Sequence, residues 1–402
     1  MSAPPGTAPG ASTGARRRAA LVVLDGVGIG AAHDAAAYGD EGSDTLGHLA
    51  DAVGGFDLPN LEALGLGTLA PLRGMRADVA ARGARTTLQP VSAGKDSTTG
   101  HWELCGVVLE RPFPIYPGGF PPDVIDAFAR LTGRRVLGNV VGSGTDVIAR
   151  FGDEQVRTGG LIVYTSADSV FQVAAHEGVV PLPELYAACE AARGMLRAPH
   201  DVSRVIARPF DGTSGGYRRT ANRRDYAIPP AGETLLDALA AAGLARAGVG
   251  KVDDLFAGRA ISATHTAGNA EGIDRIRAWL AGDESGFLFA NLVDFDQLFG
   301  HRNDVAGFYG ALRQFDRALP SLVSALREDD LLLITADHGN DPTTPSTDHA
   351  RERVPVLIAG PRVRPVQLAE RSTFADVGAT VAAWFGLSWR GRGTSFLAEV
   401  VA

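Results

Sequence analysis

The sequence predicts an α/β protein whose core is a mostly parallel β-sheet flanked by helices, with a smaller α+β domain inserted into that core. Two observations support the core. Short apolar runs lead into aspartate or glycine, and they alternate with segments of helical periodicity, which is the pattern of βαβ units. A third observation supports the insertion, because residues 111–230 open on a proline-rich region and close on Pro229 and Pro230.

Four continuous apolar runs predict the strands of the core sheet. They cover residues 20–24, 287–293, 331–335 and 354–359. Runs of this length and composition are typical of strands that are buried on both faces, as in a parallel sheet. The first three lead into acidic residues, and the fourth ends at Gly360.

Segments with apolar residues at helical spacing predict the helices that flank this sheet. They cover residues 233–242, 270–280, 305–326 and 374–385. The third segment contains Pro320, which lacks the N–H group that a helix interior uses, so we expect a kink or a restart there. In the inserted domain, two strands and a helix between them are predicted over residues 161–165, 204–207 and 183–196.

These elements divide the chain into four parts. Residues 1–18 are rich in Ala, Pro, Gly and Ser and predict a disordered tail. Residues 19–110 form the first part of the core domain, and residues 231–402 form the second part. The inserted domain lies between them, over residues 111–230.

The composition excludes several classes of protein. Of 402 residues, 45% are hydrophobic and 21% are charged, so the chain buries a core and is not disordered as a whole. The net charge of −8 argues against general binding of nucleic acid, which needs a basic surface. The apolar runs are too short to span a bilayer, and two cysteines cannot form a disulfide framework. We expect a cytoplasmic protein with no membrane contact and no obligate protein partner.

Acidic residues and histidines gather just beyond the predicted strands. This group consists of Asp25, Asp296, His301, Asp337, His338 and His349. Because ligands bind beyond the carboxyl ends of parallel strands, these side chains can converge at one edge of the sheet. Mixed Asp and His ligands suit divalent manganese, zinc or iron. Six of them suit two ions that share a site about 4 Å across.

Residues 94–103 (GKDSTTGHWE) carry three consecutive hydroxyl groups, those of Ser97, Thr98 and Thr99. One interpretation is a helix start at which these residues cap the first turn. The other is a nucleophile, because a metal ion can deprotonate a hydroxyl and a helix N-terminus stabilises an incoming phosphoryl group. This segment alone favours neither interpretation.

Gly26, Gly28 and Gly30 follow the first predicted strand. This spacing differs from that of a dinucleotide-binding loop, and no acidic residue follows about 20 positions on at a second strand end. The alternative function of a nicotinamide-dependent oxidoreductase is therefore supported by this glycine turn alone. We attribute the glycines to a close approach of the backbone to a metal ion held by Asp25.

Long segments of the chain match one known family. They include VVLDGVGIG, GKDSTTGHWELCGV, YTSADSVFQVAAHE, NLVDFDQLFGHRND and ITADHGNDPTTPSTDHARERVPVL. In these segments the chain resembles the bacterial phosphopentomutase family of the alkaline phosphatase superfamily, and only residues 1–18 fall outside the resemblance. The resemblance implies an alkaline-phosphatase-like core with an inserted cap domain that binds the substrate.

The resemblance also implies a two-metal centre with a hydroxyl nucleophile. The expected ligands are Asp25, Asp337 and His338 for one ion, and Asp296, His301 and His349 for the other. Ser97 stands where the family typically has a threonine nucleophile that touches both ions. Serine is the nucleophile in other members of the superfamily, so we assign this role to Ser97, beside the neighbouring hydroxyls of Thr98 and Thr99.

The activity implied is the interconversion of ribose 1-phosphate and ribose 5-phosphate, and of their 2-deoxyribose analogues, in nucleoside salvage and pentose catabolism. A phosphoserine enzyme and a sugar bisphosphate would be the intermediates. The family typically uses two Mn²⁺ ions and is activated by glucose 1,6-bisphosphate or a pentose bisphosphate. The expected substrate-binding positions are Ser166 and Asp168 at the sugar, and Arg208, Arg223 and Lys251 near the phosphate that does not react.

Other functions remain open at this stage. The nearest is a metal-dependent phosphatase or phosphodiesterase on the same core, which would release phosphate without isomerising the sugar phosphate. A cofactor-independent phosphoglycerate mutase shares the metal set, but its nucleophile segment and inserted domain differ. The complete set of six ligands and the hydroxyl group argue against a third alternative, a metal-binding protein without catalytic activity. The cap favours transfer over hydrolysis, because closure of a cap excludes water.

Overall fold

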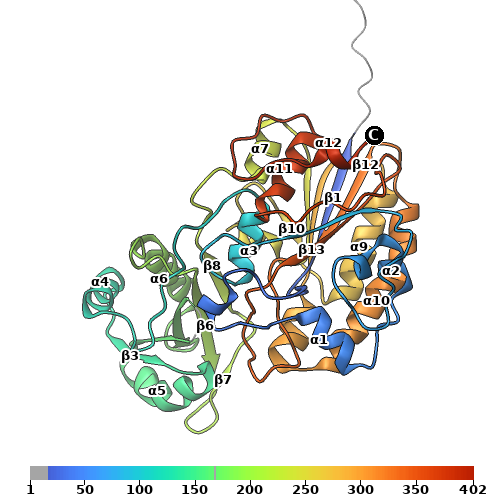
Figure 1. Cartoon of the computed structure of the whole chain (residues 1–402). Coiled ribbons are helices and arrows are strands. Elements are labelled where there is room, and N and C mark those ends of the chain that lie inside the picture. The colour runs from blue at the N-terminus through green and yellow to red at the C-terminus, as the bar shows by residue number, and fades with distance from the viewer. Residues whose placement is uncertain (1–16, 167–168) are drawn as a thin grey trace, which may run out of the picture.

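The computed structural model describes residues 17–166 and 169–402, and two β-sheets organise them (Figure 1). The larger sheet has seven strands in the order β10-β9-β11-β1-β12-β13-β2. Their bounds are β1 (Arg18–Leu24), β2 (Ala84–Leu88), β9 (Arg246–Val249), β10 (Ala263–Thr264), β11 (Gly286–Leu292), β12 (Asp330–Thr335) and β13 (Val354–Ala359). Every neighbouring pair is parallel except the two that β13 makes, with β12 and with β2. The predicted mostly parallel sheet is therefore confirmed.

The four apolar runs form the centre of this sheet. Every residue of β1, β11, β12 and β13 is buried, as expected for strands covered on both faces. Each strand agrees with its predicted range to within two residues. Strands β2, β9 and β10 were not predicted, because they are short and mix polar with apolar residues.

The predicted tail overlaps the first strand by one residue. Arg18, placed in the tail by the sequence interpretation, is the first residue of β1 and is only 2% exposed. Its guanidinium forms a buried ion pair with Asp330 at the start of β12, and it donates to the carbonyl groups of Leu280 and Gly282. These bonds satisfy a charge that would otherwise keep the segment out of the sheet. Residues 1–16 lie outside the described residues.

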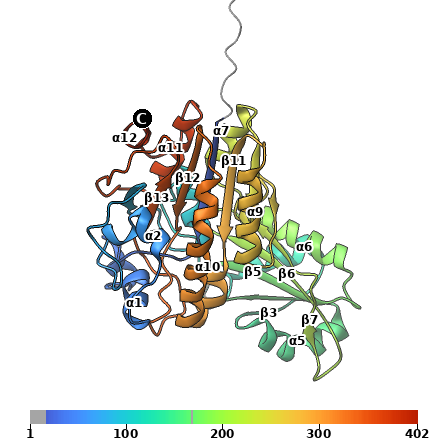
Figure 2. The same ribbon diagram turned by 90° about the vertical axis from the view of Figure 1, so that its right-hand side faces the viewer.

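Helices cover both faces of the larger sheet. Their bounds are α1 (Thr45–Ala52), α2 (Pro59–Leu64), α3 (Ser97–Leu104), α7 (Leu235–Ala241), α8 (Val252–Leu255), α9 (Asn269–Ala281), α10 (Val305–Ser324), α11 (Ala375–Trp384) and α12 (Leu397–Val400). Short 3₁₀ turns cover Ala35–Tyr38, Leu66–Thr68 and Gly300–Arg302, and a π-turn covers Phe295–Phe299. Helices α9 and α10 pack together on one face, and α11 packs against α3 and α7 on the other (Figure 2). The four predicted core helices are thereby confirmed.

Helix α10 runs through Pro320 without the restart that the sequence analysis gave as one possibility, and a kink at this residue stays a prediction. The proline leaves the carbonyl group of Asp316, four residues earlier, without its usual helical donor. The side-chain amide of Asn60 donates to that carbonyl at 3.0 Å. The Asp316 carboxylate in turn accepts from the backbone N–H groups of Asn60 and Leu61 at the start of α2. A neighbouring helix therefore supplies the bond that the proline removes.

The second sheet has strands in the order β3-β4-β5-β6-β7, and β8 pairs with β6. Its elements are β3 (Val136–Val141), β4 (Leu161–Thr165), β5 (Val170–His176), β6 (Arg204–Asp211), β7 (Arg218–Arg219), β8 (Arg224–Ala227), α4 (Pro122–Thr132), α5 (Gly144–Thr158) and α6 (Leu182–Met195). One apolar cluster joins α4 and α6 to one face, and a smaller cluster joins α5 to the other. All of these elements lie within residues 111–230, and the exact bounds of the inserted domain stay a prediction. Across the part of the chain described here, no helix is both long and apolar enough to cross a bilayer.

Candidate metal centre and nucleophile

Three neighbouring parallel strands carry the candidate ligands to one edge of the larger sheet. Asp25 follows β1 directly, Asp296 lies in the turn after β11, and Asp337 comes two residues after β12. Strands β11, β1 and β12 are adjacent and parallel, so their carboxyl ends meet. This arrangement places the three carboxylates together, as the sequence interpretation expects.

The first set of candidate ligands is fully buried. The Nε2 atom of His338 lies 3.3 Å from Asp25 Oδ1 and 3.4 Å from Asp337 Oδ2. One ligand atom from each of these three residues lies within 4.8 Å of the others, which is close enough to hold one ion. The structure therefore brings together Asp25, Asp337 and His338.

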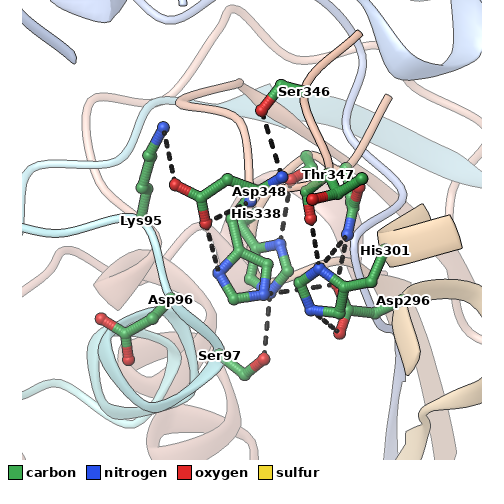
Figure 3. A network of polar contacts seen from close by, with 12 residues as sticks. Lys95, Asp96, Ser97, Asp296, His301, His338, Ser346, Thr347 and Asp348 are labelled. Carbon is green, nitrogen blue, oxygen red and sulfur yellow. Dashed lines mark hydrogen bonds and ion pairs between the residues drawn. The ribbon is translucent and has the colours of Figure 1, made fainter. Parts of the chain in front are cut away.

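The second set surrounds Asp296. The Nε2 atom of His301 lies 3.1 Å from Asp296 Oδ2, and the Nε2 atom of His349 lies 3.3 Å from Asp296 Oδ1. The imidazole ring centres of His301 and His349 are 4.8 Å apart, and those of His338 and His349 are 4.2 Å apart. His338 is thus close to both sets, and the six residues form one continuous cluster. Figure 3 shows Asp296, His301 and His338 of this cluster beside Ser97.

The donor atoms fit divalent metal ions. His301 Nδ1 faces the carbonyl oxygen of Thr347 and His338 Nδ1 faces that of Gly339. A carbonyl oxygen only accepts hydrogen bonds, so each Nδ1 keeps its proton, and in the neutral imidazole each Nε2 can offer its lone pair to a metal ion. In addition, Asp337 Oδ2 and His349 Nε2 are buried, and their contacts with His101 and Asp296 lack the geometry of a hydrogen bond. An ion shared by these atoms would satisfy them.

The charges in this cluster act strongly on one another. Burial alone would lower the pKa of His338, but the carboxylates of Asp337 and Asp25 raise it well above its usual value. The hydrogen bond to Asp296 raises the pKa of His301 to about 9. Burial, together with the charge of Asp337, raises the pKa of Asp25. Metal binding requires neutral imidazoles, so it would release protons from this cluster.

Ser97 is the hydroxyl that faces the ligands. It is the first residue of α3, its Oγ lies 3.0 Å from His338 Nε2, and it donates to Asp25 Oδ1 at 3.4 Å. The two neighbouring hydroxyls differ. Thr99 donates its hydroxyl to Asp96, the residue that caps the helix, and Thr98 lines the cleft described below. The cap of this helix is therefore Asp96 rather than one of the three hydroxyl residues, and the nucleophile role of Ser97 stays a prediction.

Lys95 connects the nucleophile turn to the loop that carries His349. Its ammonium group lies 3.0 Å from Asp40 and 3.6 Å from Asp348 (Figure 3). Asp348 in turn accepts from the backbone N–H of His349 at 2.8 Å. This ion-pair chain ties Ser97 and His349 into one network, although Asp348 is largely exposed.

A cleft of about 600 Å³ separates the metal centre from the second sheet. Ser97, Asp25, Asp296, His301 and His349 line it on the side of the larger sheet. On the opposite side, its lining residues include Arg204, Arg223, Arg224 and Asp225. The cleft has room for a small phosphorylated sugar between a cluster of acids and a cluster of arginines.

The expected substrate-binding residues divide into two groups. Arg223 and Lys251 line the cleft, and Arg223 donates from two nitrogen atoms to the Asp225 carboxylate at 2.6 Å. Arg208 does not line the cleft and donates to the side chain of Gln172. Ser166 follows β4. Asp168 lies outside the described residues.

Sequence reasoning missed the two amides that support the ligands, whereas it did single out His101 as a residue that could orient the site. Asn291 donates to Asp25 Oδ2 at 2.8 Å, and Asn340 donates to Asp296 Oδ1 at 2.7 Å. The Nδ1 atom of His101 lies 3.0 Å from Asp337 Oδ2 and 2.9 Å from the carbonyl oxygen of Ser97. Asn291 lies in an apolar run, and Asn340 follows the ADHG segment. The only sequence feature that could have indicated their role is that each is a single amide residue close to a predicted ligand.

Comparisons with known proteins give one family. The model of the metalloenzyme superfamily matches residues 17–389. The chain is 55% identical to the phosphopentomutase of Carboxydothermus hydrogenoformans, over 96% of this chain and 99% of that protein. It is 54% identical to the phosphopentomutase of Anaeromyxobacter dehalogenans, over 96% and 99% of the two chains. Among solved structures, the phosphoglycerate mutase of Leishmania mexicana covers 96% of this chain and 98% of its own, at 14% identity and a TM-score of 0.49.

Proposed function

The chain belongs to the phosphopentomutase family of the metalloenzyme superfamily, and we propose that it interconverts ribose 1-phosphate and ribose 5-phosphate. The 2-deoxyribose phosphates are included in the proposal. One observation carries it: the Ser97 hydroxyl stands 3.0 Å from His338 Nε2, at the helix N-terminus beside both candidate ligand sets. A nucleophile in this place can receive and return a phosphoryl group.

Two Mn²⁺ ions per chain are part of the proposal. Asp25, Asp337 and His338 would hold one ion, and Asp296, His301 and His349 would hold the other, and the Ser97 hydroxyl lies near His338 and Asp25. When bound, such ions neutralise phosphoryl oxygens and lower the pKa of a hydroxyl. The mixed oxygen and nitrogen donors suit manganese better than calcium or magnesium.

The proposed reaction consists of two phosphoryl transfers, and each transfers a different phosphoryl group. Phosphorylated Ser97 gives its phosphoryl group to the free hydroxyl of the bound sugar phosphate. The Oγ–P bond breaks, a sugar O–P bond forms, and a sugar bisphosphate results. The bisphosphate then reorients and phosphorylates Ser97 with its other phosphate, which releases the isomer. A sugar bisphosphate such as glucose 1,6-bisphosphate, or a pentose bisphosphate, would phosphorylate Ser97 for the first cycle.

The protein's own residues orient these steps. The N-terminus of α3 presents its N–H groups to the phosphoryl group on Ser97. Arg223 and Lys251, which line the cleft, would contact the sugar phosphate, and Ser166, Asp168 and Arg208 complete the proposed substrate site. Water competes with the sugar for the phosphoryl group, and the second sheet across the cleft would limit its access.

The test is ³¹P nuclear magnetic resonance of the protein with Mn²⁺, ribose 1-phosphate and a trace of glucose 1,6-bisphosphate. We expect a growing ribose 5-phosphate signal with the wild type and none with Ser97→Ala. A second variant, Thr98→Val, tests the adjacent hydroxyl and should still become phosphorylated.

Two results would contradict the proposal. Release of inorganic phosphate without ribose 5-phosphate would identify a phosphatase. Full activity of Ser97→Ala, together with loss of activity in Thr98→Val, would move the nucleophile to Thr98.

A further inference from the structure

The segment that leads into Ser97 has no regular secondary structure, yet its backbone is extensively hydrogen-bonded. It comprises residues 90–94, between β2 and α3, and we name it the approach segment. The N–H groups of residues 91–94 all have acceptors, which are the side chains of Glu103 and Tyr38 and one backbone carbonyl group. Pairing of this kind gives an irregular segment a defined conformation.

Arg351 binds the carbonyl groups of the approach segment. Its Nη1 atom donates to the carbonyl oxygens of Ser92 and Gly94 at 2.7 and 2.5 Å, and Nη2 donates to that of Pro90 at 3.1 Å. The other two N–H groups donate to the carboxylate of Asp34 at 3.0 and 2.9 Å. A guanidinium group has five N–H donors in a fixed plane, and all five are used here. The residue is 2% exposed.

Glu103 holds the approach segment through the opposite backbone groups. Its carboxylate accepts from the N–H groups of Val91 and Ser92 at 3.1 and 2.8 Å, and from that of Phe374 at 3.0 Å. Glu103 lies on α3 and is 1% exposed. The segment is therefore held between a buried cation that binds its carbonyl groups and a buried anion that binds its N–H groups. Hydrogen bonds to charged groups are stronger than those between neutral groups.

The backbone around Arg351 is fixed to the chain segments that carry the candidate ligands. Arg351 comes two residues after His349. Ala350, between them, exchanges two backbone hydrogen bonds with Gly339, at 2.7 and 3.0 Å, and Gly339 follows His338. The guanidinium group therefore joins the approach segment to the candidate metal centre.

We propose that Arg351 is a positioning residue that sets the place of the Ser97 hydroxyl relative to the metal centre, with Glu103 as its counterpart. The inference rests on the proposed function and adds a residue that the sequence resemblance did not assign. Arg351 acts through the backbone, because the described residues that line the cleft do not include it. Lysine cannot replace it, because an ammonium group is a single point of charge and lacks the planar set of five donors.

The experiment measures the coupling between Arg351 and Ser97 without turnover. Orthovanadate resembles a phosphoryl group in transfer, and it is titrated into the protein loaded with Mn²⁺ while heats are recorded by calorimetry. We expect Ser97→Ala and Arg351→Lys each to weaken vanadate binding about tenfold or more, because each removes a well-placed oxygen. The double variant should bind vanadate like Ser97→Ala alone, because a displaced hydroxyl has little left to lose.

Arg353→Lys is the matched control. Arg353 lies two positions further along the chain, and its guanidinium pairs with Glu370. This variant should bind vanadate like the wild type. If Arg351→Lys does not fold, Glu103→Gln takes its place in the same test, because it removes the opposite charge and keeps the shape of the side chain.

Kinetics separate positioning from general damage. With ribose 1-phosphate as substrate, Arg351→Lys should lower kcat about 100-fold, because a displacement of about 1 Å has an effect of this size. KM and the affinity for Mn²⁺ should stay within about twofold, since neither the cleft nor the ligands are changed. A merely structural role would instead raise KM or weaken Mn²⁺ binding.

The outcomes distinguish the inference from the proposed function. Additive losses of vanadate affinity in the double variant overturn the inference, and so does an equal loss of Mn²⁺ affinity in Arg351→Lys. Losses that are not additive support it even if the wild type proves to be a phosphatase. If Ser97→Ala binds vanadate like the wild type, Ser97 is not the nucleophile, and both the proposed function and the inference are wrong.

Discussion

Ser97 owes its orientation to the residue before it. Asp96 caps α3 by accepting from the backbone N–H and the hydroxyl of Thr99. This cap fixes the first turn of the helix and leaves the Ser97 side chain facing His338 and Asp25. A hydroxyl on a capped first turn loses little conformational freedom when it reacts. The cap that starts the helix therefore also positions the hydroxyl that we propose as the nucleophile.

The two supporting asparagines should each control one metal ion. Asn291 donates to Asp25 and Asn340 donates to Asp296, and a buried donor of this kind orients a ligand carboxylate. We expect Asn291→Leu to weaken the ion of the Asp25 set, and Asn340→Leu to weaken the ion of the Asp296 set, each by about tenfold or more. Titration with Mn²⁺, followed by electron paramagnetic resonance of the free ion, measures both affinities.

A His301→Ala background shows which ion is affected. This variant disables the Asp296 set and should leave one ion bound. Adding Asn291→Leu should weaken that remaining ion, whereas adding Asn340→Leu should not, because independent sites have additive effects. Equal effects of the two substitutions in this background would contradict the pairing of each amide with one ion.

Among individual residues, the sequence best predicted the positions of the charged ligand residues. The structure brings together Asp25, Asp296 and Asp337 because their strands are adjacent and parallel, which apolar runs reveal. Asn291 and Asn340 could not be found in the same way, because an amide next to a strand has many uses.

At the scale of secondary-structure elements, hydrogen bonds to the side chain of Glu352 connect the turn after β1 with the start of α1. Its buried carboxylate accepts from the N–H groups of Gly30 and Thr45 and from the Thr45 hydroxyl. Burial raises its pKa from 4.5 to about 8, and the charges of Asp341 and Asp44 add to the increase. The folded protein therefore holds a proton here that the unfolded chain releases above about pH 4.5.

Because the folded and unfolded states differ in this proton, the free energy of unfolding depends on pH. Between about pH 5 and pH 8 the folded state binds more protons than the unfolded state, so the free energy of unfolding falls as pH rises. The contribution of Glu352 is on the order of 4 kcal/mol over that window. Urea unfolding without added metal should show a smaller decrease for Glu352→Gln than for the wild type. Identical pH dependence in the two proteins would show that Glu352 is ionised when folded.

The ion pair between Arg18 and Asp330 fastens β1 to β12. Both side chains are 3% exposed. We expect Arg18→Met to lower the free energy of unfolding by about 3–5 kcal/mol, because it leaves a buried carboxylate unpaired. Arg17→Met is the matched control, since exposed Arg17 makes one hydrogen bond to the carbonyl of Trp384 and should cost much less. Urea denaturation of the three proteins measures the difference.

A double variant checks the cause. Arg18→Met combined with Asp330→Leu removes both charges and should recover part of the lost stability. If the double variant is as unstable as the sum of its single variants, the loss reflects packing rather than the unpaired charge.

Strands and helices could be predicted from the sequence where burial of apolar side chains alone determined their composition. Buried strands in the parallel sheet are apolar throughout, so β1, β11, β12 and β13 were found. The restart considered at Pro320 is absent because Asn60, far away in the sequence, donates to the carbonyl group that the proline leaves without a donor. Strands β3 and β5 of the second sheet were missed, and β3 is only partly buried, so its pattern is weak.

Across the whole molecule, the family match confirms the alkaline-phosphatase-like core that the resemblance implied. The two sheets face each other across the cleft, with the acidic ligands on one side and the arginines on the other. This division of charge suits a substrate with a phosphate at each end. One phosphate would meet the metal centre while the second sheet holds the other.

Metal ions should stabilise the larger domain as a whole, because the ligands come from segments that are distant in sequence. Asp25 follows β1, Asp296 follows β11, and the loop after β12 supplies Asp337, His338 and His349. Binding to the folded state alone adds about 2.7 kcal/mol per site when the free ion is at 100 times its Kd. We therefore expect chelation to lower the urea midpoint and added Mn²⁺ to restore it. Asp337→Asn should show a smaller shift, since it impairs one set. An unchanged midpoint after complete removal of metal, verified by atomic emission, would mean that the loops are already held in place by bonds such as those of Asn291 and Asn340.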